Sequence, residues 1–126
     1  MRNVIKHAVP LLAVVAALAV ALPATAATTS MGVIGSARSS GDFAVAAANG
    51  NRDNAKAVYL RGYGRGLSGF AVVACSKGFS VGSKSTTLSH MSSGRQYKLK
   101  IPFAGDCDVT ASLSGSGSIR LQILAA

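Results

Sequence analysis

The stretch Leu67-Ser68-Gly69-Phe70-Ala71-Val72-Val73-Ala74-Cys75 decides the fold of this 126-residue chain. Apolar side chains occupy both the odd and the even positions of the run, which predicts a strand buried on both faces. The run ends on one of only two cysteines, and the other, Cys107, opens the last β-rich stretch. We therefore expect a central strand that is joined to a distant one.

An even count of two cysteines predicts a single disulfide, Cys75–Cys107, in any chain that reaches an oxidising compartment. Closing a loop of this length is worth about 3–4 kcal/mol in the chain-entropy model. The alternative is a metal-binding or catalytic thiol pair. That alternative lacks C-x-x-C spacing and has only His90 as an extra ligand, so the disulfide is favoured.

The N-terminus has the pattern of a secretory signal peptide. Arg2 and Lys6 precede the apolar stretch 11–22, and an Ala-x-Ala site follows at 24–26. Twelve apolar residues are too few for a stable membrane span, which takes about 20. We expect residues 1–26 to be cleaved and the product to be secreted to the extracellular space. The alanine-rich signal and the absence of an N-x-[ST] sequon fit a bacterial exporter.

The remaining residues, 27–126, have the length of one domain with a modest core. We expect residues 27–41 to be a segment that precedes the folded domain and can be flexible. The whole chain carries a formal net charge of +9, with four aspartates and no glutamate. Glycine and serine recur throughout, which favours short strands and turns over helices.

Short apolar runs separated by turn-forming residues predict the first strands. A hairpin is expected from 43–48 and 55–60, with the polar segment 49–54 as its loop. The glycine-rich segment 61–66 then reads as a turn into the central run, and 76–78 as the turn out of it. Shorter strands are expected at 79–81 and, as an edge strand, at 84–89.

The last third of the chain alternates more regularly. Residues 96–101 place Tyr97, Leu99 and Ile101 on one face and polar side chains on the other. A hairpin is expected from 109–113 and 119–123 around a turn at 114–117. Six to eight short antiparallel strands with one disulfide predict an all-β, single-domain β-sandwich.

The sequence carries no pattern typical of an enzyme. His90 is the single histidine after the signal peptide, lies in a polar stretch, and has no G-x-S-x-G elbow beside it. Asp106 and Asp108 are the only close pair of carboxylates, and they flank Cys107, which favours roles at a turn or strand start. We expect no catalytic residues, so the protein is predicted not to be an enzyme.

The asparagine-rich segment 49–54 has the alternating oxygen ligands of a calcium loop. Arg52, however, places a positive charge inside it, and the twelfth position is Leu60 where a bidentate glutamate is needed. A hairpin loop explains the segment better. We expect no metal and no cofactor.

The segment 61–66 is the most suggestive local feature, because two guanidiniums flank an aromatic ring. Positive charge also serves solubility alone, and that simpler interpretation remains open. The functional hypothesis is a basic face for an anionic partner: a cell-wall polymer, a lipid headgroup or extracellular nucleic acid. Its candidate residues are Arg61, Tyr63, Arg65, Lys56, Lys98, Lys100 and Arg120.

The alternative function is a small secreted effector, either an antimicrobial or toxin-like protein or a protease inhibitor. Lys77 follows the cysteine in Cys75-Ser76-Lys77-Gly78. A lysine on a turn beside a disulfide resembles a preorganised substrate of a trypsin-like secreted protease, because rigidity limits the entropy lost on binding.

Overall fold

The computed structural model describes residues 31–126, which form six antiparallel strands. Within this part of the chain there is no helix, and so none that could cross a membrane. The predicted signal peptide lies outside the described residues and stays a prediction. The strands are β1 (Gly32–Ser39), β2 (Ala44–Ala55), β3 (Val58–Lys77), β4 (Ser80–Met91), β5 (Gln96–Lys98) and β6 (Gly105–Ala125).

Two long strands, β3 and β6, run side by side and organise the sheet. On the free edge of β6, β2 pairs with the first half and β1 with the second. On the free edge of β3, β5 pairs with the first half and β4 with the second. The sheet is therefore four strands wide, with each edge made of two shorter strands placed end to end.

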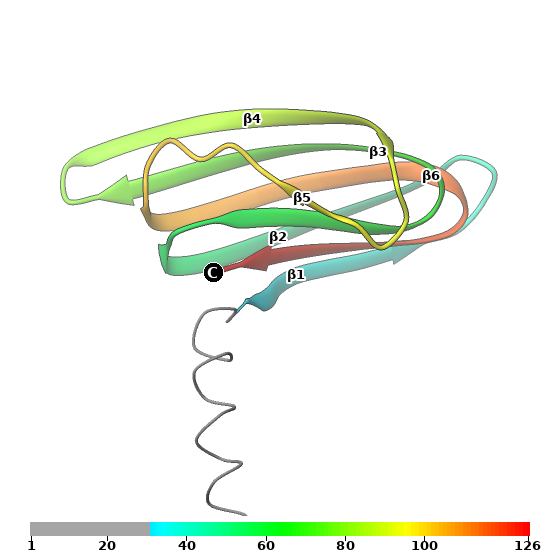
Figure 1. Cartoon of the computed structure of the whole chain (residues 1–126), viewed down its shortest axis with the longest axis horizontal. Helices are drawn as coiled ribbons and strands as arrows, with labels where there is room; N and C mark the ends of the chain where they lie inside the picture. Colours follow the sequence, from blue (N-terminus) through cyan, green and yellow to red (C-terminus); the bar gives the residue numbers. More distant parts are fainter. Residues whose placement is uncertain (1–30) are drawn as a thin grey trace, which may run out of the picture. The chain divides into compact units, whose positions relative to one another are not determined.

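Across its width the sheet is interrupted or bent at one level, which we call the corner (residues 40–43, 64–66, 92–95 and 116–118). There β1 is separated from β2 and β4 from β5, whereas β3 and β6 continue and their pairing shifts register. The two long strands turn back there at one end of the view in Figure 1. Glycines permit this bend because they accept positive φ without a steric penalty. Five of them at the corner have positive φ, namely Gly41, Gly64, Gly66, Gly94 and Gly117.

The corner folds the sheet into the two layers of a small β-sandwich. Layer 1 consists of β1, β5, 58–63 of β3 and 119–125 of β6. Layer 2 consists of β2, β4, 67–77 of β3 and 105–115 of β6.

The core lies between these two layers, which approach closely. A Cβ on Gly62 of layer 1 would lie 2.9 Å from the Leu113 side chain of layer 2. The largest fully buried side chains of the core are Leu60, Leu67, Leu113, Leu121, Ile123, Val58, Val73, Val109 and Cys107.

The run that decides the fold is a central strand, as expected, but it is buried on one face only. Ala71, Val73 and Cys75 are between 1% and 3% exposed, whereas Phe70 on the opposite face is 45% exposed. The prediction of burial on both faces was wrong. A single sheet folded once covers its inner face and leaves its outer face to solvent.

Three predicted turns lie inside strands. The segment 49–54 belongs to β2, 61–66 to β3 and 114–117 to β6. The two expected hairpins around 49–54 and 114–117 were therefore wrong, and the chain instead turns at 56–57. The glycine-rich segments 61–66 and 114–117 lie at or beside the corner. There each long strand bends and passes from one layer to the other, whereas a hairpin turn would return the chain alongside itself in the same layer.

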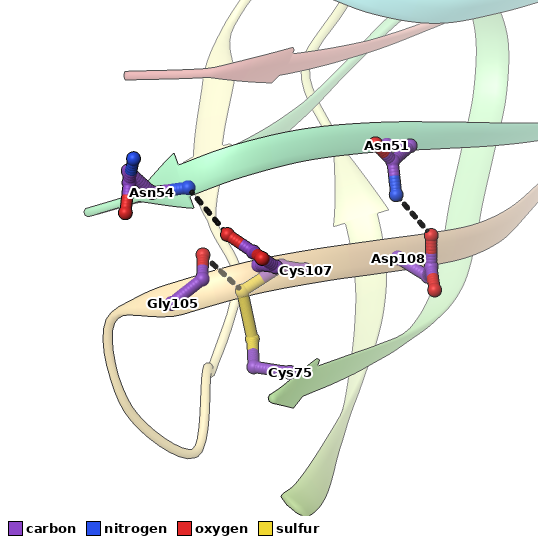
Figure 2. Close-up of a disulfide and its surroundings, with 7 residues drawn as sticks. Asn51, Asn54, Cys75, Gly105, Cys107 and Asp108 are labelled. Carbon is purple, nitrogen blue, oxygen red and sulfur yellow. Dashed lines mark hydrogen bonds between the residues drawn. A yellow bond between two sulfur atoms is a disulfide. The ribbon is translucent and has the colours of Figure 1, made fainter. Parts of the chain in front are cut away.

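The disulfide Cys75–Cys107 is confirmed and joins β3 to β6. The two cysteines are direct cross-strand partners with a Cα–Cα distance of 4.0 Å and a sequence separation of 32. Figure 2 shows the bridge beside the end of β2, where the Asn51 side chain donates a hydrogen bond to Asp108. The bridge therefore pins the end of layer 2 that lies away from the corner.

The remaining expectations were met in part. Tyr97, Leu99 and Ile101 do point inward, although β5 itself has only three residues. Strand β4 is an edge strand and is longer than the predicted 84–89. The segment 27–41 contains β1, a strand that the sequence pattern had not indicated.

The hydroxyl of Tyr97 holds the corner between β4 and β5. It accepts a hydrogen bond of 2.7 Å from the backbone N–H of Ser92. This hydrogen bond, with a smaller contribution from the nearby Arg95 guanidinium, lowers the pKa of Tyr97 below the ordinary tyrosine value.

Candidate functional site: a basic face on layer 1

The outer face of layer 1 brings together residues from four strands. Directly paired residues of a sheet point to the same side, so the strand register shows which side chains share this face. Arg61 pairs with Gln122, which in turn pairs with Ser36, and Tyr63 pairs with Arg120. We call this surface the basic face; it consists of Lys98, Gln96, Tyr59, Arg61, Tyr63, Arg120, Gln122, Ser36 and Arg38.

No acidic residue shares the basic face. The chain has only four acidic residues. Asp42 lies at the corner, and the others belong to β2 and β6 of layer 2. The outer face of layer 2 differs, because its paired rows carry serine, threonine, asparagine, Asp106, Asp108 and apolar side chains such as Phe70, but no lysine or arginine. Positive charge is thus concentrated on one of the two outer faces.

Arg61 is held in place by its neighbours. Its Nε and Nη2 atoms both donate to Oε1 of Gln122, at 2.9 and 2.7 Å. Its Cζ also lies 5.7 Å from the centre of the Tyr63 ring. These contacts fix the guanidinium without neutralising its charge, because both partners are uncharged.

Arg120 stacks on the same tyrosine from the neighbouring strand. Its Cζ lies 4.3 Å from the centre of the Tyr63 ring, well within the range of a cation–π interaction. The Nε atom is buried and has no hydrogen-bond acceptor among the described residues. Buried donors without an acceptor are uncommon, and because the protein encloses this one, it is not itself a contact for a ligand.

The two tyrosines of the basic face have different surroundings. Tyr63 is engaged by two guanidiniums. The cation–π contacts of the described residues otherwise involve only Tyr97, so the half-buried ring of Tyr59 has no guanidinium over it. Tyr59 is therefore the ring available for stacking on a ligand. The glycine-rich sequence around Tyr63 pointed to that ring, whereas no local pattern pointed to Tyr59.

The structure places only some of the predicted anion-binding residues on this face. Arg61, Tyr63, Lys98 and Arg120 come together there. The others lie around it: Arg65 is exposed at the corner, Lys56 is in the turn between β2 and β3, and Lys100 follows β5. Arg38, Tyr59 and Gln122 were missed. Alternation along each strand places these three side chains on its outward side. Only the pairing between distant strands shows that they lie on the same face.

Lys77, the candidate inhibitory residue, lies in layer 2. It pairs with Ser80 across a two-residue turn in which Gly78 has a φ of +63°. The bond after Lys77 therefore lies inside a tight reversal. An extended backbone is what peptide-binding enzymes commonly pair with, and this turn does not present one.

The residues weighed as catalytic or metal-binding do not converge. His90 is the next-to-last residue of β4, has a φ of +56°, and lies in a hollow lined by glycine, serine, leucine and methionine, with no carboxylate. Asp106 accepts a hydrogen bond from the backbone N–H of Asn54 at 3.1 Å, which is a structural role. Residues 31–126 contain no group of three or more His, Cys, Asp or Glu side chains arranged to hold a metal ion.

No protein-family model and no curated protein sequence matches the chain. Among solved structures, it is similar to a family two carbohydrate esterase from Cellvibrio japonicus, with a TM-score of 0.40 and 13% identity over 75% of this chain and 30% of that chain. It is also similar to TmCBM61 in complex with β-1,4-galactotriose, with a TM-score of 0.35 and 10% identity over 75% of this chain and 66% of that chain. The chain thus spans under a third of the first structure and about two thirds of the second.

Proposed function

We propose that this protein is a secreted, non-enzymatic binding protein that holds an anionic extracellular polymer on the basic face. The observation that carries the proposal is the grouping of three arginines and one lysine on one outer face with no acidic residue among them. Arginine recognises phosphate and carboxylate through paired N–H donors, and the exposed lysine adds charge.

Two further features support a binding role. Arg61 and Arg120 are already ordered by Gln122 and Tyr63, so little side-chain entropy is lost when an anion binds. Tyr59 adds an aromatic surface of the kind on which sugars and bases stack. Charge that served solubility alone would need neither this ordering nor this grouping.

Binding driven by charge should weaken steeply as salt is added. The purified, oxidised protein is titrated with single-stranded DNA and, separately, with a phosphate-containing cell-wall polymer at increasing salt. With four cations in contact, the logarithm of the binding constant should fall linearly with log[salt], with a slope of about −3 for single-stranded DNA. A neutral polysaccharide should not compete. Binding that is absent at low salt or unaffected by salt contradicts the proposal.

Arg61→Gln tests the face at its centre. This change removes one ordered guanidinium, so we expect about tenfold weaker binding at low salt and a slope smaller in magnitude by about 0.7. The matched control is Lys77→Gln, which removes the same charge from the exposed turn of layer 2. Equal losses in the two variants would indicate that net charge matters and the basic face does not.

Tyr59→Ala tests the stacking role of the free ring. Loss of one stacked base typically weakens binding by about 1–3 kcal/mol, so single-stranded DNA should bind about 5- to 150-fold less tightly. The salt slope should stay the same, because no charge is removed. Tyr59→Phe keeps the ring and should bind like the unchanged protein. An equal loss in both variants would argue against stacking.

A further inference from the structure

A second group of cations lies at the edge where β4 and β5 meet. Lys84, Lys98 and Lys100 line a shallow hollow of about 520 Å³, together with Leu99 and Ile101. No acidic residue lines it. The three lysines come from β4, from β5 and from the segment after β5, so the hollow joins the edges of the two layers.

The backbone around this lysine hollow is firmly held. The N–H of Leu99 donates to the carbonyl of Val58 at 2.8 Å, and the N–H of Lys100 donates to Oγ1 of Thr86 at 2.9 Å. Thr86 is only 9% exposed. Lys84 pairs with Val73, whose side chain is buried, so Lys84 starts on the inner side of layer 2 and is directed toward layer 1.

The lysine hollow continues the basic face. Lys98 belongs to both, and from it the cations cross the strands of layer 1 obliquely. Arg61 lies on β3, two residues beyond Tyr59, which is the partner of Lys98. Arg120 lies on β6, two residues beyond Gln122, which is the partner of Arg61. Arg38 is directly opposite Arg120 on the last strand. With ordinary sheet spacings, successive charges along this line are about 8 Å apart between Lys98 and Arg120.

We propose that a single unbranched polyanion crosses layer 1 along this oblique line and ends in the lysine hollow, where Lys84 contacts it from the other layer. The inference rests on the proposed function and specifies its ligand as a flexible linear chain with about one negative charge per monomer. A flat lipid surface cannot contact Lys84 and Arg38 together, because the path turns from the outer face of layer 1 around its edge. A flexible chain can follow that turn.

The test uses single-stranded oligonucleotides of increasing length and the variant Lys84→Gln. The unchanged protein should gain affinity steeply from dinucleotide to hexanucleotide and only slightly beyond. Lys84→Gln should bind the hexanucleotide several-fold more weakly, with a salt slope reduced by about 0.7. Lys84→Arg should restore both values. Lys77→Gln, in the strand paired with β4, should leave both unchanged.

The outcomes separate the two proposals. If Arg61→Gln weakens binding but Lys84→Gln behaves like Lys77→Gln, the basic face binds the polymer and the path through the lysine hollow is wrong. If vesicles of anionic lipid bind as tightly as the hexanucleotide and lose affinity equally with Lys84→Gln, the linear ligand is wrong. If the unchanged protein binds no oligonucleotide at low salt, both proposals fall.

Discussion

Reduction of the Cys75–Cys107 disulfide is expected to lower the free energy of unfolding by about 3–4 kcal/mol. The bridge closes a loop with a sequence separation of 32, and opening it restores conformational freedom to the unfolded chain. Small domains have about 5–15 kcal/mol in total, so this loss is a large fraction of the stability. Urea unfolding with and without a reductant measures it.

The double variant Cys75→Ala/Cys107→Ala is the control for this prediction. It should be destabilised to a similar extent, and the reductant should have no further effect on it. The bridge lies in layer 2, so the folded, reduced protein should keep its affinity for a polyanion. Stability that is unchanged by the reductant would contradict the prediction.

The variant Gly64→Ala is expected to destabilise the protein by about 3 kcal/mol through strain at the corner. Gly64 has a φ of +141°, a region that is almost exclusive to glycine. An added Cβ would also lie 2.7 Å from Cγ2 of Ile119 and 3.2 Å from Cδ2 of Leu67, both in the core. Thermal or urea unfolding measures the loss.

Gly66→Ala is the matched control, two residues away in the same strand. Gly66 has a φ of +59°, and an added Cβ would meet nothing within 4 Å. Only the backbone cost of a left-handed alanine applies, which is about 1 kcal/mol. Equal losses in the two variants would show that packing at the corner contributes nothing.

The sequence pattern predicted the fold class, the disulfide and the central strand, but it failed at the corner. Segments 61–66 and 114–117 have the composition of turns. Glycine serves equally for a chain reversal and for a bend within a long strand, and composition does not distinguish the two. Leu60 and Leu67 lie on either side of the bend in β3 and are both buried. That both face one core could be recognised only once the two halves of β3 were known to lie in opposite layers.

The basic face was predicted in part, for a related reason. Alternation within one strand places Lys98 or Arg120 on an outer face, and this much is local information. That Arg120 lies against Tyr63 and opposite Arg38 depends on pairing between strands far apart in the sequence. The register of such pairs is set by the whole sheet, so the contributions of Arg38, Tyr59 and Gln122 could not be read from the chain.

The central position of β6 determines when this domain can fold. β6 pairs with β1, β2 and β3, so neither layer is complete before residues 105–125 have been synthesised. Domains dominated by such distant pairings fold slowly, typically in milliseconds to seconds. Together with the export predicted from residues 1–26, this topology leads us to expect that the chain is exported before its sheet has formed.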